Sequence, residues 1–165
     1  MAFFWWSDTS LSYRHMESEQ RECQFCQSVQ KHTYRLYEEK QKAYSAITTG
    51  TEKHITLICH GCLHENQLEK NYEQELLEKY QKEDIVREAY DLSELGKYKD
   101  AIKRYDKILK KDPSYVHAIY GKASCLVSLK QYDEAEPYIA ELTRLYPDNH
   151  DVLEMQSILE RKLSA

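Results

Sequence analysis

The sequence predicts an α+β fold, in which a small N-terminal β domain precedes an all-α superhelix of repeated helical hairpins. Three observations lead to this prediction. Residues 1–66 contain β-favouring segments and two Cys-x-x-Cys pairs, and residues 68–95 contain no Gly or Pro. Residues 82–149 repeat one pattern of apolar, small and helix-ending positions every 34 residues.

The totals fit a folded chain of one ordinary domain or two small ones. The 165 residues are 41% hydrophobic and 31% charged, with three prolines and four glycines, which favours helix over disorder. The formal net charge of -5 gives no general attraction to nucleic acid or to anionic membrane. No apolar run approaches the ~20 residues that a membrane-spanning helix needs.

The chain starts with the aromatic segment MAFFWW, which has no basic region before it and no small-residue cleavage site after it. We therefore expect no secretory signal. The segment is expected either to pack as an edge of its own domain or to contact a partner or a lipid interface. A chain without a signal is expected in the reducing cytoplasm, where paired cysteines serve metal binding or redox chemistry more often than structural disulfides.

Two segments of the N-terminal region are predicted strands. HTYRLY (32–37) and HITLIC (54–59) are rich in β-branched and aromatic residues. The intervening TTGTEK contains Gly50, which we expect in the turn between them. A three-stranded ribbon is the expected arrangement.

Four of the five cysteines form the pairs Cys23-x-x-Cys26 and Cys59-x-x-Cys62, separated by 32 residues. Two such pairs, each presented from a tight turn, can place four sulfurs around one ion when the turns face each other. We therefore predict a structural metal site made by these four cysteines. Zn²⁺ is the expected ion, with iron as the alternative. The remaining Cys125 stands in an apolar setting and is expected to be a small buried hydrophobe.

The cysteine layout resembles that of small zinc-ribbon domains, although Gln27 and Leu63 stand where such knuckles commonly have glycine. His60 and His64 are spare ligands or supporting groups in this interpretation. A redox dithiol is the alternative, because a strand-like segment precedes Cys59 and a polar helix-like segment follows the pair. A thioredoxin-like fold, however, needs a longer scaffold and a cis-proline, and residues 1–112 contain no proline.

The middle of the chain is predicted to be helical. Leu68, Tyr72, Leu76 and Tyr80 recur every four residues, which indicates one long helix, or two with a slight break near residues 82–84.

Residues 82–115 align with 116–149 at seven identical positions. The pairs are Ile85/Ile119, Ala89/Ala123, Leu92/Leu126, Leu95/Leu129, Tyr98/Tyr132, Ala101/Ala135 and Pro113/Pro147. Each falls where two antiparallel helices need a small contact residue, an apolar side chain or a stop. Gly96 is expected to adopt a positive φ in the first turn between helices, and the repeated proline ends each second helix.

The segments AYDLSELGKYKDAIKRYDKILKKDP and ASCLVSLKQYDEAEPYIAELTRLYP resemble the tetratricopeptide repeat. Ile108 and Leu142 depart from it, because the family usually has a small alanine there. Pro137 is expected in the first turn of its helix, where amides have no intrahelical acceptor anyway. Two repeats are fewer than the three usually needed for stability, so the segment after Pro147 is expected to form a capping helix.

The resemblance implies binding of a protein or peptide on the concave face of the repeats. The residues expected there are Glu83, Val86, Tyr90, His117, Tyr120 and Ser124. None of them is Lys, Arg or Asn, so the carboxylate clamp that grips chaperone C-termini is not expected. The aromatic, weakly polar face suits an extended or helical apolar peptide. Alternatively, Tyr90 and Tyr120 only pack inside a short array.

The predicted organisation is a zinc-ribbon-like domain at 1–66, a connecting helix at 67–81, two tetratricopeptide repeats at 82–149 and a capping helix at 150–165. The expected function is that of a non-enzymatic adaptor, because no phosphate loop or Ser-His-Asp pattern occurs and four thiolates leave the metal no open position. A nucleic-acid-associated protein and a thiol redox protein are the alternatives. The first of these would use the ribbon, whose basic residues interleave with tyrosines, although residues 1–66 hold 7 Lys plus Arg against 8 Asp plus Glu, a net of -1.

Overall fold

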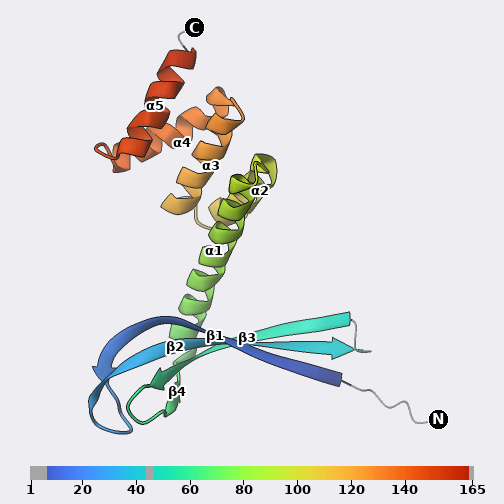
Figure 1. Ribbon diagram of the computed structural model, residues 1–165, viewed down its shortest axis with the longest axis vertical. Coiled ribbons are helices and arrows are strands. Elements are labelled where there is room, and N and C mark those ends of the chain that lie inside the picture. The colour runs from blue at the N-terminus through green and yellow to red at the C-terminus, as the bar shows by residue number, and fades with distance from the viewer. Residues whose placement is uncertain (1–6, 44–46, 164–165) are drawn as a thin grey trace, which may run out of the picture. The chain divides into compact units, whose positions relative to one another are not determined.

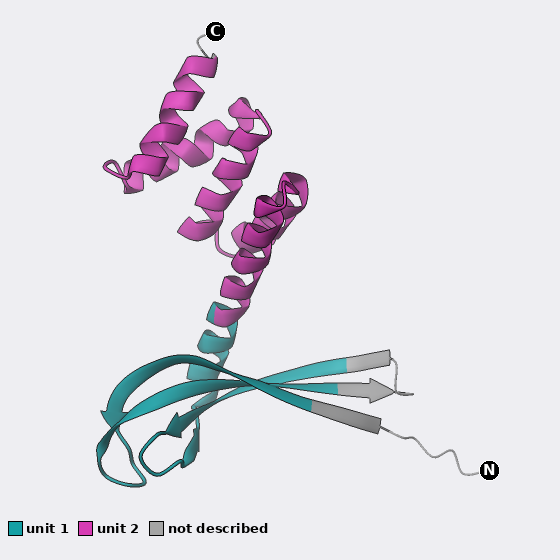
Figure 2. Cartoon of the chain, viewed as in Figure 1, with its two compact units in different colours: residues 1–79 teal, residues 80–165 magenta. Residues whose placement is uncertain are grey.

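The computed structural model describes residues 7–43 and 47–163, so the aromatic start at residues 1–6 lies outside the described residues. A four-stranded antiparallel sheet precedes five α-helices (Figure 1), which confirms the predicted α+β class. The chain divides into two compact units, Met1–Lys79 and Tyr80–Ala165 (Figure 2).

The sheet is a meander in the order β1-β2-β3-β4. Its strands are β1 (Ser7–Glu22), β2 (Val29–Ala43), β3 (Ile47–Cys59) and β4 (Glu65–Gln67). The two predicted strand segments lie within β2 and β3. Period-2 burial in these strands places Tyr34, Leu36, Ile55 and Leu57 in the core of the N-terminal unit, each no more than 3% exposed.

Gly50 does not form the predicted turn. It lies in β3 opposite Gln41, whereas β2 ends at Ala43 and β3 begins at Ile47. The next pair in the register is Lys42 with Thr48, so β3 carries one extra residue at this point. The irregularity is a β-bulge, and glycine within a strand commonly marks a bulge as well as a turn.

Helix α1 (Lys70–Glu94) is continuous, without a break near residues 82–84. Its first turns are tied to the sheet within the N-terminal unit. The backbone amide of Ile55 donates to the Glu73 carboxylate at 2.8 Å, and the phenol oxygens of Tyr34 and Tyr72 are 2.8 Å apart.

The remaining helices are α2 (Tyr98–Leu109), α3 (Val116–Ser128), α4 (Tyr132–Leu145) and α5 (His150–Leu163). Gly96 has a φ of 72°, as predicted, and Lys130 has a φ of 61° at the position 34 residues later. The predicted small contact residues are confirmed, since all four alanines are 0% exposed: Ala89, Ala101, Ala123 and Ala135. Cys125 is also buried, at 2% exposed. No helix in the described ranges is both long and apolar enough to cross a membrane.

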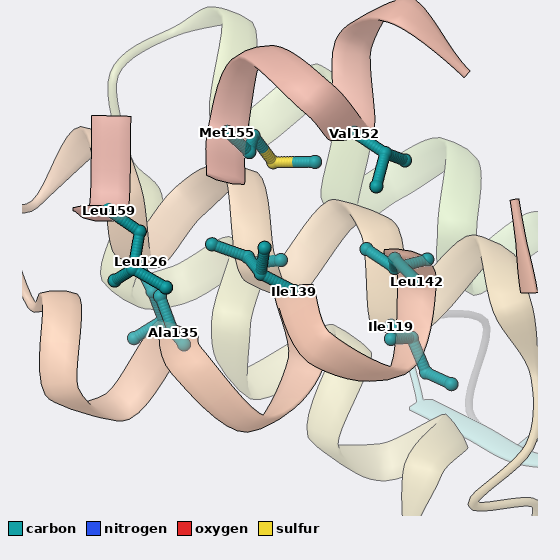
Figure 3. Close-up of a cluster of buried hydrophobic side chains, with 9 residues drawn as sticks. Ile119, Leu126, Ala135, Ile139, Leu142, Val152, Met155 and Leu159 are labelled. Carbon is teal, nitrogen blue, oxygen red and sulfur yellow. The ribbon is translucent and has the colours of Figure 1, made fainter. Parts of the chain in front are cut away.

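Helix α5 covers the open side of the second hairpin. Its residues Val152, Met155 and Leu159 join the buried cluster around Ile139 and Leu142 (Figure 3). Leu142, and the equivalent Ile108 in the first hairpin, are at most 2% exposed, so both fill space that an alanine would leave empty.

The predicted position of Pro137 in a first turn is wrong. Helix α4 begins at Tyr132 after the N-cap Gln131, which makes Pro137 its sixth residue. A residue at this position normally donates its amide to the carbonyl four residues back, that of Asp133, and proline has no N–H to donate. The helix starts earlier than expected because the preceding turn already closes at Lys130, in the left-handed conformation.

Candidate functional site

Each Cys-x-x-Cys pair forms a tight turn beside the end of a strand. In the first turn, the amide of Gln27 donates to the Cys23 carbonyl at 2.8 Å, and the amide of Cys23 donates to the Ser28 carbonyl at 3.0 Å. These two bonds fold the backbone around the sulfurs and leave both side chains of the pair on one side of the turn.

The second turn repeats the first. The amide of Leu63 donates to the Cys59 carbonyl at 2.9 Å, and the amide of Cys59 donates to the His64 carbonyl at 3.0 Å. Gln27 and Leu63 have φ values of 53° and 60°, in the left-handed region that favours glycine. The knuckle backbone is therefore formed although neither residue is the glycine that is common there.

The two turns bring four sulfurs together. The Cys23 and Cys62 sulfurs are 3.8 Å apart, the Cys26 and Cys59 sulfurs are 3.9 Å apart, and all four lie within 4.8 Å of one another. Sulfurs bound tetrahedrally at about 2.3 Å from one ion are about 3.8 Å from each other. The four predicted cysteines are thus placed to hold a metal ion.

The surroundings of Cys23 and Cys62 shift the pKa values of their thiols in opposite directions. The backbone amide of Cys26, together with His32, lowers the pKa of the Cys23 thiol to about 5. At Cys62 the amide of His64 lowers the pKa, but burial and the neighbouring thiols outweigh it and raise the pKa to about 12. Four thiolates without a cation would repel one another, and a bound cation removes this penalty.

A histidine missed in the sequence supports the cluster. His32 is 1% exposed and helps to lower the pKa of the Cys23 thiol, while its Nδ1 lies 2.9 Å from the Gln30 carbonyl oxygen. Its position two residues before Tyr34 on the buried face of β2 was the available signal.

The two histidines considered as spare ligands lie outside the sulfur cluster. The Nε2 atom of His60 is 2.8 Å from the Thr33 hydroxyl, and the ring of His64 stacks on Phe25 at 4.2 Å between centroids. The site described by the structure is therefore an all-sulfur one.

The helical unit contains a hollow of about 570 Å³, which we call the tyrosine hollow. All six residues predicted on the concave face line it: Glu83, Val86, Tyr90, His117, Tyr120 and Ser124. Tyr90 is 57% exposed and Tyr120 is 36% exposed, so neither ring is packed inside the array.

Six further residues line the tyrosine hollow that the sequence did not predict there: Arg87, Ser93, Glu94, Tyr105, Tyr115 and Gly121. Tyr105 reaches it from α2, because Gly121 on α3 has no side chain in the way. Arg87 also lines it, one turn before Tyr90, and its guanidinium is 2.7 Å from the Asp84 carboxylate. The predicted concave face includes no residue of α2, which excludes Tyr105, whereas Arg87 lies on the same helix as the predicted Val86 and Tyr90.

An aromatic row crosses the sheet. Tyr13 pairs with Tyr37, and Tyr37 pairs with His54, in register across β1, β2 and β3. The rings of Tyr37 and His54 stack at 4.7 Å, and the guanidinium of Arg35 lies 4.8 Å from the centre of the Tyr13 ring. Such cross-strand pairs stabilise a sheet, and exposed rings of this kind can also stack on nucleobases.

Comparison with known families agrees with the helical geometry. Residues 92–159 match the family model described as tetratricopeptide repeat, which confirms the predicted resemblance over this part of the chain. A search of the curated proteins found no match. The structure and this match define the class: a helical region, similar to the tetratricopeptide repeat over residues 92–159, preceded by an antiparallel sheet that carries a four-cysteine cluster.

Proposed function

We propose that the protein is a non-enzymatic adaptor, which binds a protein or peptide partner in the tyrosine hollow and uses a structural Zn²⁺ to hold its N-terminal unit. The supporting observation is the exposure of Tyr90 on α1 and Tyr120 on α3, which both line one hollow of the helical unit that contains the tetratricopeptide-repeat match. Tyrosine is enriched among residues that dominate the energy of protein interfaces. Repeat arrays bind partners mainly through such concave surfaces.

The hollow has the character of a site for one side chain of a partner. Val86 and the rings of Tyr90, Tyr105 and Tyr120 supply apolar surface, and Ser124 is among the polar residues that also line it. An apolar anchor residue in an aromatic-lined pocket is a recurring mode of peptide recognition.

The test for partner binding uses the full chain. The double variant Tyr90→Ala/Tyr120→Ala removes both exposed rings. We expect that proteins of a cytoplasmic extract that can be cross-linked to wild type are no longer cross-linked to this variant. Tyr146→Ala is the matched control, because Tyr146 is 44% exposed and is not among the residues of the hollow. Identical cross-linked proteins from wild type and the double variant would contradict the proposal.

Zinc is the ion proposed for the cysteine cluster. Four thiolates satisfy a tetrahedral Zn²⁺ completely and leave no position for a reacting water, which supports a structural role and no catalytic one. Thiolate ligands require a reducing compartment, so the proposal places the protein in the cytoplasm. A thiol redox role is disfavoured because the shortest sulfur contacts, 3.8 and 3.9 Å, join cysteines of different pairs.

Native mass spectrometry of the full chain tests the metal. We expect one Zn²⁺ per chain, its loss in Cys59→Ser, and its retention in Cys125→Ser, which changes a buried cysteine of the helical unit. Bound iron would contradict zinc as the ion but not the four-cysteine metal site. A disulfide within one Cys-x-x-Cys pair and no bound ion would instead support the redox alternative.

Nucleic-acid binding is the second candidate function, favoured by the aromatic row of Tyr13, Tyr37 and His54. The nearby Arg35 is already engaged, since its guanidinium donates to the Tyr37 phenol at 3.0 Å and lies 3.5 Å from the Glu65 carboxylate. Binding of single-stranded oligonucleotides that falls steeply with salt and is lost in Tyr13→Ala would support this candidate over the adaptor.

A further inference from the structure

The tyrosine hollow continues along α3 toward α5. Tyr120 and Ser124 line both the hollow and a second depression of about 400 Å³. The second depression is further lined by Val127, Ser128, Asp151, Glu154, Met155 and Ile158. We call the two together the groove, which runs over residues of α1, α3 and α5 within the helical unit.

The groove is acidic. Glu83 and Glu94 lie in the tyrosine hollow, and Asp151 and Glu154 lie in the second depression. Arg87 is the single Lys or Arg among the lining residues, and it is held by Asp84 outside the groove lining. Within the described part of the chain, Glu83, Glu94 and Glu154 form no ion pair.

Tyr120 connects the apolar and acidic parts. Its ring faces the tyrosine hollow, and its hydroxyl donates to the Asp151 carboxylate at 3.3 Å. That contact orients the carboxylate at the junction of the two depressions. The other group that Asp151 approaches among the described residues is His150, at 3.7 Å, whose side chain is 91% exposed.

The position of the apolar hollow beside the acidic depression indicates which partner segment would fit the groove. An apolar or aromatic side chain fits the tyrosine hollow, and a cation a few residues away meets Asp151 and Glu154. A partner with Asp or Glu at the same place would be repelled by these two carboxylates. Such like-charge repulsion is an efficient means of rejecting wrong partners.

We propose that the partner segment is a basic peptide, with an apolar anchor in the tyrosine hollow and Lys or Arg side chains against Asp151 and Glu154. This inference rests on the proposed function, because it assigns the chemistry of the partner to the same groove. It differs from that function by predicting the sign of the partner's charge.

Selection from a phage library of random 12-residue peptides on the full chain tests the inference. We expect the selected peptides to share an apolar or aromatic residue and an excess of Lys and Arg. Selection on Asp151→Asn/Glu154→Gln should lose the excess of basic residues while it keeps the apolar one. Asp133→Asn/Glu134→Gln is the matched control, because it removes two charges from the first turn of α4, outside the groove lining.

The affinity of one selected peptide for wild type and for each variant measures the contribution of the two carboxylates. We expect the Asp151→Asn/Glu154→Gln variant to bind roughly 3- to 10-fold more weakly than wild type at low salt, and the difference to vanish near 1 M salt, because surface ion pairs are weak and screened. The control variant should bind like wild type.

The outcomes separate the two proposals. Selected peptides without a charge bias, or with an acidic bias, overturn the basic-partner inference and leave the adaptor intact. Peptides whose enrichment is unaffected by Tyr90→Ala/Tyr120→Ala, or the absence of any enrichment, overturn the proposed function itself. Thermal unfolding of each variant, matched to wild type, shows that the groove is still folded.

Discussion

The ring of Tyr105 on α2 occupies the space beside Gly121 on α3, where a Cβ would collide with the ring carbons and the hydroxyl oxygen. Tyr105 is 3% exposed, and its burial raises the pKa of the phenol to about 12. The contact links the core of the first hairpin to the floor of the tyrosine hollow. Gly121 is therefore required by packing, although its position in a helix is intrinsically unfavourable.

Gly121→Ala should lower the free energy of unfolding of the helical unit. Alanine gains about 1 kcal/mol of helix propensity, but forcing the buried ring aside costs about 1–3 kcal/mol. We expect a net loss of up to about 2 kcal/mol in urea unfolding followed by helical circular dichroism. Ser124→Ala on the same helix is the control, with little change expected. Tyr105→Leu in the Gly121→Ala background should recover part of the loss, and a stabilised single variant would refute the packing argument.

Gln27→Gly and Leu63→Gly should each stabilise the metal-bound N-terminal unit. Both positions have a positive φ, which costs a residue with a side chain about 1–2 kcal/mol. We expect each variant to retain its metal at higher concentrations of a competing chelator than wild type, because a relaxed knuckle favours the bound state. Gln24→Gly, inside the first turn but without a positive φ, should show no such gain. Equal or weaker retention in both variants would contradict the prediction.

The helical half could be predicted because its rules are local and repeated. Ala89 and Ala123, like Gly96, occupy positions that the 34-residue period fixes directly. Pro137 was misplaced because the exact start of a helix depends on a turn that Lys130 closes in the left-handed conformation, where Lys gives no signal. Asp151 and Glu154 were not assigned to the concave face, since α5 was considered only as a cap.

The sheet was harder to predict because its contacts depend on register. Strand β1 (SDTSLSYRHMESEQRE) is polar on both faces, so no alternation of apolar residues reveals it. The spacing of the cysteines was enough to predict that their four sulfurs converge. The alternation along β2 can place His32 on the buried face, but its position opposite Cys59 follows from the pairing of β2 with β3, which the sequence does not reveal.

Pro137→Lys should stabilise the helical unit by about 1–3 kcal/mol. The substitution restores an amide that can donate to the Asp133 carbonyl, and lysine is the residue found 34 positions earlier, at Lys103. Pro137 is exposed, so the longer side chain has room. Urea unfolding measures the gain. Pro147→Lys, beyond the end of α4, is the control and should give no gain. Equal gains at both positions would show that the restored hydrogen bond to Asp133 is not the cause of the stabilisation.

The ion pair of Lys82 with Asp112 should make the stability of the helical unit depend on pH in the acidic range. The ammonium of Lys82 donates to the Asp112 carboxylate at 2.7 Å, and the Ser114 hydroxyl donates to the same side chain at 2.9 Å. The hydrogen bond from Lys82, followed by that from Ser114, lowers the pKa of Asp112 below its ordinary value. A carboxyl with a lowered pKa in the folded state contributes stability above its unfolded pKa, and this contribution disappears as the pH falls through the folded pKa.

Asp112→Asn should therefore be less stable than wild type at pH 7, by up to about 1 kcal/mol, because the pair is only partly buried. The difference should shrink as the pH falls below about 4, where the wild-type carboxyl itself becomes protonated. Urea unfolding of both chains at pH 7 and at pH 2.5 measures it. Asp148→Asn, at an exposed loop position, is the matched control and should show no comparable dependence. A difference between wild type and Asp112→Asn that persists undiminished at pH 2.5 would mean that the asparagine disturbs packing and that the charge of Asp112 contributes nothing.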